Sequence, residues 1–305
     1  MQSIAALSVD ENLWTMAKGI ADTPLVLHSH FNRTINYLYK GRMLTLASES
    51  IDNATDTVRL SKKAFQMYFQ VVPQEVILSK KGIQVDKQCL IEWDGAELWR
   101  GEQPVFPSET SILARNIELV KQSLMKQKKP VWAHLDNEGS EKSVNDVMQE
   151  LIYQESQKLF EALRDFPNKN KQLEETKLFG LGVGLTPSGD DVLTGVSFVS
   201  SMPNYPIDLS QQHKKWNKRA EQKTNKISET AIYQATKGQG RESMHVFLKA
   251  LFSSQDKKEL LESLEHVLAI GSSSGSEIVW GMIQAAEIGY TQNNAKTFKE
   301  EHDGY

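Results

Sequence analysis

Between Pro24 and Gly101, short runs of branched and aromatic residues alternate with turn-forming residues, a pattern typical of β-strands. Asp94-Gly95 predicts a β-hairpin, because glycine accepts the positive φ of a type I′ turn without steric cost. Lys81-Gly82 predicts a similar reversal. This spacing favours an antiparallel sheet or a small barrel. The predicted strands cover 43–46, 75–78, 83–85, 90–93 and 96–99.

From Ser108 onward the apolar residues recur with a period of about 3.6, which is typical of amphipathic helices. Ser143 and Asp146 predict a capping box at the start of one helix. The apolar stripe expected to follow it contains Val144, Val147, Met148, Leu151 and Ile152. Further helical stripes are expected at 112–124, 159–163, 244–251 and 260–268.

The predicted fold class is therefore α+β, with two domains. Residues 1–106 form an N-terminal antiparallel β-rich domain, a sheet or a small barrel, with a short N-terminal helical segment. Residues 107–305 form a mainly α-helical domain that carries a glycine-rich motif. Pro104 and Pro107 mark the boundary. The length of 305 residues agrees with about two domains.

Composition narrows the function classes. The net charge of −4 argues against a protein that coats nucleic acid or an anionic membrane. Cys89 is the only cysteine, which excludes an intramolecular disulfide and argues against a cysteine-based zinc site. With no signal-peptide pattern and no long apolar run, a cytoplasmic protein without membrane contact is expected. The basic stretch 211–226 is either an anion or nucleic-acid site or, as is usual for charge runs, a solvated helix face.

The segment 180–191, with the sequence GLGVGLTPSGDD, carries the candidate chemistry. Thr186 is a suitable N-cap and Pro187 suits the first helical position, so free N–H groups are expected to form an anion site at a helix start. Asp190 and Asp191, expected to be exposed there, are the catalytic candidates. They would repel bare phosphate, so they fit better if they bind an amino group, take a proton, or hold a magnesium ion that bridges to phosphate. The alternative is a well-capped helix after a glycine-rich turn. The candidate binding residues are Gly184, Thr186, Ser188 and Gly189.

A later segment, Ser274–Gly281, aligns with Ser188–Gly195. Each begins with Ser-Gly, has an acid at the same offset, continues with two branched apolar residues and ends in glycine. Two such helix starts could face each other across one pocket, or the similarity could be chance between two capped helices. Ser274 and Gly275 join the candidate binding residues on the first interpretation.

Polar residues also interrupt a strand-like stretch near the N-terminus. His28, Ser29 and Asn36 are predicted to form one wall of the site that the helical domain holds. His28 and His30 would face the same side of a strand, but no further ligands accompany them, so a zinc site is not predicted.

The glycine-rich motif, from Gly182 to Asp191, resembles the signature of the AllH family, a subunit of the catabolic oxamate carbamoyltransferase. Three weaker segments extend the resemblance over most of the chain. They are Leu27-His28-Ser29-x-Phe31 with Asn36, the pair Thr224 and Ser228, and Gly271 to Gly275. Ser272 stands where the family usually has histidine, so activity or substrate could differ.

The resemblance implies a multi-subunit enzyme of allantoin and purine nitrogen catabolism, with AllG-like and FdrA-like subunits as partners. Its reaction would cleave oxalurate with phosphate to oxamate and carbamoyl phosphate. No cofactor is implied for certain, and magnesium remains an option for the aspartates. The alternative is a non-catalytic subunit that binds a small carboxylate or phosphate, or serves assembly.

Overall fold

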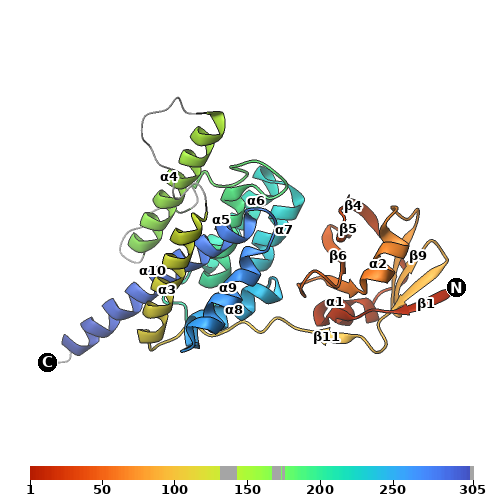
Figure 1. The fold of residues 1–305 in the computed structure, drawn as a ribbon, viewed down its shortest axis with the longest axis horizontal. Coiled ribbons are helices and arrows are strands. Elements are labelled where there is room, and N and C mark those ends of the chain that lie inside the picture. Colours follow the sequence, from red (N-terminus) through yellow and green to blue (C-terminus); the bar gives the residue numbers. More distant parts are fainter. Residues whose placement is uncertain (131–142, 167–172, 174–175, 303–305) are drawn as a thin grey trace. The chain divides into compact units, whose positions relative to one another are not determined.

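The computed structural model describes residues 1–130, 143–166, 173 and 176–302 (Figure 1). The chain forms two compact units. The first contains Met1–Glu102 together with Gly240–Glu242, and the second contains Gln103–Gln239 and Ser243–Tyr305. Each unit has its own hydrophobic core.

The N-terminal unit contains two open sheets and two short helices. The helices are α1 (Glu11–Lys18) and α2 (Lys62–Phe69). The first sheet has the order β1 (Gln2–Ala5), β10 (Cys89–Glu92), β9 (Gly82–Val85), β8 (Val76–Ser79) and β3 (Thr23–Pro24). The second has the order β11 (Glu97–Trp99), β2 (Ser8–Asp10), β7 (Thr57–Leu60), β6 (Arg42–Ser48), β5 (Thr34–Tyr39) and β4 (Val26–His30).

The predicted α+β class is confirmed, but the sheets are mixed rather than purely antiparallel. β1 runs parallel to β10, β11 to β2, and β6 to β7. Neither sheet closes into a barrel, because each has two edge strands. The expected reversal at Lys81-Gly82 is confirmed, since β8 and β9 pair antiparallel across it.

The predicted hairpin around Asp94-Gly95 is wrong. Gly95 has the expected positive φ of 81°, yet β10 and β11 lie in different sheets. β9 and β1 already occupy both sides of β10, so β11 pairs with β2 instead. The turn residues therefore indicated the backbone conformation of Gly95 but not the pairing of the strand that follows.

The segment Gly240–Glu242 belongs to the N-terminal unit although it lies far along the chain. Arg241 forms an ion pair with Asp52. The backbone N–H of Glu242 donates to the carbonyl of Asn53 at 2.8 Å, and its carboxylate accepts from the Asn53 amide at 3.1 Å. Four consecutive residues of the first unit, 52–55, thus have contacts with a segment that follows α7 in the chain.

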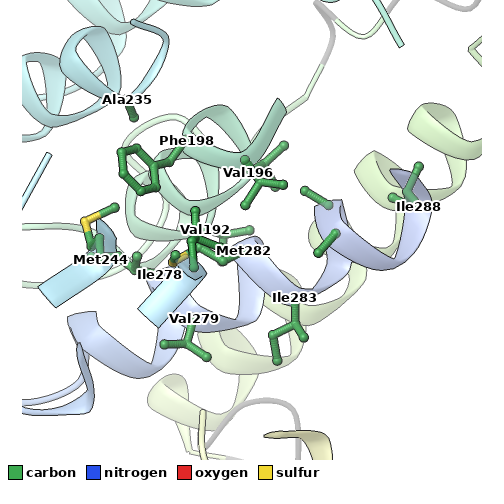
Figure 2. Close-up of a cluster of buried hydrophobic side chains, with 14 of the residues drawn as sticks. Val192, Val196, Phe198, Ala235, Met244, Ile278, Val279, Met282, Ile283 and Ile288 are labelled. Carbon is green, nitrogen blue, oxygen red and sulfur yellow. The ribbon is translucent and has the colours of Figure 1, made fainter. Parts of the chain in front are cut away.

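The C-terminal unit is helical. Its helices are α3 (Ser111–Gln127), α4 (Val144–Asp165), α5 (Ser188–Ser200), α6 (Ser210–Lys223), α7 (Lys226–Ala235), α8 (Glu242–Ser253), α9 (Lys257–Leu268) and α10 (Ser274–His302). α5 is the central helix, because every residue from Gly189 to Ser200 is buried. Val192 and Val196 of α5 pack against Ile278 and Met282 of α10 in the middle of the core (Figure 2). No helix in the described part of the chain is both long and apolar enough to span a membrane.

The helical predictions hold with one correction. The capping box of Ser143 and Asp146 is present, and α9 is capped by Asp256. The stripe predicted at the start of α4 is wrong for Val144, Val147 and Leu151, which are exposed, and right for Met148 and Ile152, which pack against the core. In Figure 1 this end of α4 extends away from the other described helices, which explains its exposure. The buried face of α4 contains Ile152, Leu159, Phe160 and Leu163.

The basic stretch lies on α6, which buries Trp216 and Ala220 in the core. Lys214, Lys215 and Lys218 are exposed on its other side. The stretch is therefore the exposed face of an amphipathic helix, while an anion-binding role for it stays a prediction.

Candidate functional site

The starts of α5 and α10 meet because the two helices pack with almost no space between their backbones. A Cβ atom at Gly195 would lie 2.1 Å from the carbonyl oxygen of Ile278, and one at Gly281 would lie 2.3 Å from that of Val192. Atoms at such distances overlap, so only glycine allows this approach. The two contacts are equivalent, because Gly195 aligns with Gly281 and Val192 aligns with Ile278 in the two related segments. The glycine of each helix thus contacts the same position of the other.

The second glycine of each segment repeats the pattern. A Cβ at Gly189 would lie 2.1 Å from the carbonyl oxygen of Leu178, and one at Gly275 would lie 2.1 Å from that of Val267. Each helix start is therefore seated on the backbone of the segment that precedes it. The two segments have related packing as well as related sequences, which supports the alignment.

Hydroxyl groups connect the two helix starts directly. The Oγ1 of Thr186 lies 2.7 Å from the Oγ of Ser274. The hydroxyl of Ser188 donates to the Oε1 of Glu277 at 2.7 Å. These bonds confirm the expectation that the starts of α5 and α10 face each other.

Asp191 and Glu277 form a buried carboxyl pair at this junction, with exposed fractions of 4% and 3%. Burial raises the pKa of Asp191 well above its usual value, and the nearby charge of Glu277 raises it further. Hydrogen bonds from the hydroxyls of Ser274 and Thr186 oppose this rise only in part. Oδ2 of Asp191 and Oε2 of Glu277 have no hydrogen-bond partner. Asp191 therefore keeps a proton to a higher pH than an exposed aspartate does, while Glu277 accepts from Ser188.

Asp190 points to a different group of residues. Its carboxylate accepts from the backbone N–H of Gly180 at 2.9 Å and from the hydroxyl of Thr224. Burial raises its pKa, whereas hydrogen bonds from Thr224, Gly180 and Ser228 lower it in part. Asp190 therefore connects the start of the glycine-rich loop to the junction of α6 and α7.

The structure corrects three expectations about the glycine-rich segment. Pro187 rather than Thr186 is the N-cap, because Thr186 bonds to Ser274 instead. The N–H of Gly189 is not free, since it donates to the carbonyl of Leu181 at 2.8 Å. Asp190 and Asp191 are buried, not exposed. Hydroxyl and carboxyl groups thus dominate this junction, and the expected cluster of free N–H groups is reduced.

The loop before α5 has an unusual backbone and an exposed tip. Gly180, Gly182 and Gly184 have φ values of 71°, 122° and 100°, which other residues rarely adopt. Val183, between the last two of these glycines, is 75% exposed, and Leu185, directly after the last one, is 61% exposed. The loop therefore presents two large apolar side chains beside the hydroxyl groups of the helix starts.

The N-terminal candidates form a network within their own unit. The amide of Asn36 donates to the Oγ of Ser29 at 2.9 Å, and Nδ1 of His28 lies 3.1 Å from the same oxygen. Thr45 donates to the Asn36 carbonyl oxygen at 2.8 Å. The structure thus brings these three candidates together on β4 and β5, while their contribution to a wall of the site stays a prediction. Nε2 of His30 lies 2.6 Å from the carbonyl of Phe69.

Metal binding has limited support in the described residues, where no group of three or more His, Cys, Asp or Glu side chains could hold an ion. Asp191 and Glu277 are two carboxylates, a number that Mg²⁺ often takes from a protein. Protonation of Asp191 would leave only one charged ligand. The pair therefore suits proton chemistry better than a magnesium site.

Comparison with protein families places this junction in a known group. The family model of the oxamate carbamoyltransferase subunit AllH matches residues 178–286, from the carbonyl that seats Gly189 to the middle of α10. A second model, the AllH family N-terminal domain, matches residues 5–98. The chain belongs to the AllH family. The comparison with solved structures found no match.

Within this AllH protein, the residues that carried the resemblance occupy clear positions. Thr224 ends α6 and bonds to Asp190, and Ser228 in α7 contributes to the same carboxyl environment. Ser272, in the position of the usual histidine, is exposed in the turn before α10. Thr224 and Ser228 are thus close to the glycine-rich motif through Asp190.

Sequence reasoning did not include Glu277 among the site residues. The signal was present, because Glu277 occupies the position of Asp191 in the aligned segments. Only the contact between α5 and α10 shows that these two acids of the AllH chain meet.

Proposed function

We propose that this chain is a subunit of an oxamate carbamoyltransferase in which the α5–α10 junction moves a proton during carbamoyl transfer. The observation that carries the proposal is the buried pair of Asp191 and Glu277 beneath the hydroxyls of Ser188, Ser274 and Thr186. This pair lies inside the segment matched by the AllH family model, whose name supplies the reaction class.

The proposed reaction is the cleavage of oxalurate by phosphate. An oxygen of hydrogen phosphate forms a bond to the carbamoyl carbon and loses its proton. The bond from that carbon to the amide nitrogen breaks, and the nitrogen gains a proton. The products are carbamoyl phosphate and oxamate. One proton thus moves from phosphate to nitrogen, and the reaction needs a base and an acid together.

A carboxyl pair that shares one proton supplies both. Asp191 holds the proton and is the acid, whereas Glu277 is the base. Transfer of a proton between the two carboxyls restores the starting state. Because both acids are buried, the half-buried hydroxyls of Ser188, Ser274 and Thr186 are the groups that contact substrate. Asp191 and Glu277 act through them and are positioning and relay residues.

The hydroxyls also suit the charge that develops during transfer. Negative charge appears on the carbonyl oxygen of the carbamoyl group, and oriented donors stabilise it without reorganisation. The mutual hydrogen bond of Thr186 and Ser274 fixes both hydroxyls beside Asp191, so their dipoles are oriented before substrate arrives.

The family name describes a subunit, and we propose AllG-like and FdrA-like proteins as the partners. On this proposal the enzyme serves allantoin and purine nitrogen catabolism. A second candidate function is a non-catalytic binding or assembly subunit. The exposed tip of the glycine-rich loop favours it, because Val183 and Leu185 are large apolar residues that a partner could cover.

The test is carbamoyl phosphate formation from oxalurate and phosphate by the complex reconstituted with both partners. We expect Asp191→Asn and Glu277→Gln to reduce kcat by about 10²-fold or more, because each removes one proton-transfer group while keeping its shape. Glu262→Gln, a change at an exposed acid on α9, is the matched control. Gel filtration checks that each variant still assembles.

Full activity in both site variants would refute the proton-transfer role. A wild-type complex that binds oxamate but has no turnover would favour the assembly subunit instead. In that case Val183→Ser and Leu185→Ser would prevent assembly without affecting the folded chain.

A further inference from the structure

A cavity with several polar lining residues lies at the opposite end of α5 from the candidate site. It has a volume of about 440 Å³, within the range of small-molecule sites. Its lining includes Ser200 at the end of α5 and His213 on α6. Twelve residues of helix separate Ser188 from Ser200, which places the two ends roughly 18 Å apart at 1.5 Å per residue. The cavity is therefore distinct from the α5–α10 junction.

The protonation of His213 follows from its contacts. The Ser200 hydroxyl donates its single proton to the carbonyl of Val196 at 2.7 Å. Its oxygen can then only accept from Nε2 of His213, which lies 3.0 Å away. Burial lowers the pKa of His213 to about 4, so the ring is neutral at pH 7. A neutral ring with its proton on Nε2 has a bare acceptor at Nδ1.

Nδ1 of His213 is available to a ligand. It has no hydrogen-bond partner among the described residues, and it is not among the polar atoms that are sealed from solvent. The side chain itself lines the cavity. The inner part of the cavity therefore favours a ligand that donates N–H groups.

The outer part favours the opposite charge. Lys214 and Lys237 are exposed cations on the lining. Asp208, the acid on the same lining, accepts from the backbone N–H of Ser210 at 2.9 Å, and this bond holds its pKa below the usual value. The amide of Asn217 donates to Thr236 at 3.0 Å beside them. Lys237 in turn donates to the hydroxyl of Tyr233, a neutral group that leaves the charge of Lys237 in place. Two cations against one carboxylate leave a net positive rim.

We infer that this cavity binds a small acid that carries an amide or ureido group, with its N–H toward Nδ1 of His213 and its carboxylate toward Lys214 and Lys237. The carboxylate does not suit the neutral acceptor of His213, and the N–H group does not suit the lysines. The lining of the cavity therefore fixes the orientation of the ligand. The inference does not depend on the proposed carbamoyl transfer. Oxamate belongs to the same chemical class, so the test must distinguish this cavity from the α5–α10 junction.

The experiment titrates the full-length chain with N-carbamoylglycine, followed by calorimetry and by ¹⁵N NMR of the histidine rings. We expect binding that shifts the Nδ1 resonance of His213. Acetate lacks the N–H donors and urea lacks the charge, so each should bind about five- to tenfold more weakly. His213→Phe removes the acceptor at similar size, and Lys237→Gln removes a rim charge at an exposed position. We expect both variants to weaken binding by about five- to tenfold, while Asp191→Asn leaves it unchanged.

Lys237→Gln keeps the test decisive if His213→Phe does not fold. Equal affinity of wild type and Lys237→Gln, an Nδ1 signal that does not respond, or a proton found on Nδ1 would each overturn the inference. Loss of binding in Asp191→Asn alone would place the ligand at the α5–α10 junction and would also overturn it. Activity of the reconstituted complex enters none of these readouts.

Discussion

Replacing Gly195 with alanine tests whether the contact between α5 and α10 depends on the absence of a side chain. The added Cβ would lie 2.1 Å from the carbonyl oxygen of Ile278 and 2.8 Å from the backbone N of Met282. Both neighbours are backbone atoms of a helix, so they cannot rotate away. An ordinary contact begins at 3.4 Å, so the helices must separate by about 1 Å or more.

The size of the effect follows from what that separation disrupts. Val192, Val196, Val279 and Met282 are fully or almost fully buried where the helices meet. A gap of 0.5–1 Å loses about a quarter to a half of each dispersion contact, and overpacking typically costs about 1–3 kcal/mol. Alanine regains about 1 kcal/mol of helix propensity, which does not offset a backbone clash together with a loosened core. We expect a net loss of about 2–4 kcal/mol in the free energy of unfolding of the helical unit.

The reciprocal change, Gly281→Ala, should cost about as much, because its Cβ would lie 2.3 Å from the Val192 carbonyl oxygen. The loss in free energy of unfolding of the double variant should be smaller than the sum of the two single losses by at least about 1 kcal/mol. The reason is that helices already separated by one added Cβ have room for the second. Urea unfolding gives the free energies, and hydrogen exchange at α5 and α10 assigns them to this unit. Gly19→Ala is the control, because its Cβ would meet nothing closer than 3.6 Å. A Gly195 variant as stable as the control, or strictly additive losses, would refute the reasoning.

Three further predictions concern stability and assembly. Burial raises the pKa of Asp10 to about 6, so the free energy of unfolding of the wild type falls as the pH rises from about 4 to 6. Asp10→Asn should raise this free energy by about 1–3 kcal/mol above pH 6 and leave it unchanged below pH 4. Urea unfolding across this pH range measures both effects. Asp190→Ala leaves the Gly180 N–H and the Thr224 hydroxyl without their acceptor, so the free energy of unfolding should fall by about 2–4 kcal/mol. Asp190→Asn keeps an acceptor oxygen and should lose less than half as much. Equal losses in the two variants would contradict the assigned hydrogen bonds. Val183→Ser should weaken the binding of the partner subunits at least tenfold in pull-down titrations. Circular dichroism should stay unchanged, as a check that the variant is folded. Unchanged binding would show that the loop tip is not part of the subunit interface.

The positions of strands and helices could be predicted from periodicity, while strand pairing could not. A run such as 90–93 identifies a strand, but its neighbours depend on which edges are already occupied. β1 comes from the other end of the N-terminal unit and takes the edge that a hairpin would have used. Likewise, Val144 and Val147 have helical spacing, yet spacing alone does not show whether another helix covers them. Both errors concern long-range contacts that the local pattern does not contain.

The candidate site was predictable as a motif but not as a geometry. The glycines, the hydroxyls and both aspartates were visible in one segment, and the aligned segment indicated a second helix start. Local reasoning placed Asp190 and Asp191 together in the exposed first turn of a helix. In the structure, adjacent positions on a buried helix point them in different directions, Asp190 to Gly180 and Asp191 to Glu277. Burial and the partner of each acid depend on α10, which begins more than eighty residues later.

The return of Gly240–Glu242 to the N-terminal unit has a consequence for synthesis on the ribosome. A domain made of one continuous stretch can finish folding as soon as its last residue leaves the exit tunnel. Here Asp52 and Asn53 must wait for Arg241 and Glu242, which are translated about 140 residues after the end of the first stretch. At 5–20 residues per second this delay is roughly 7–30 s. During that time the nascent N-terminal unit lacks the contacts that Arg241 and Glu242 supply, and its completion is coupled to the emergence of the central helix α5 and of α7.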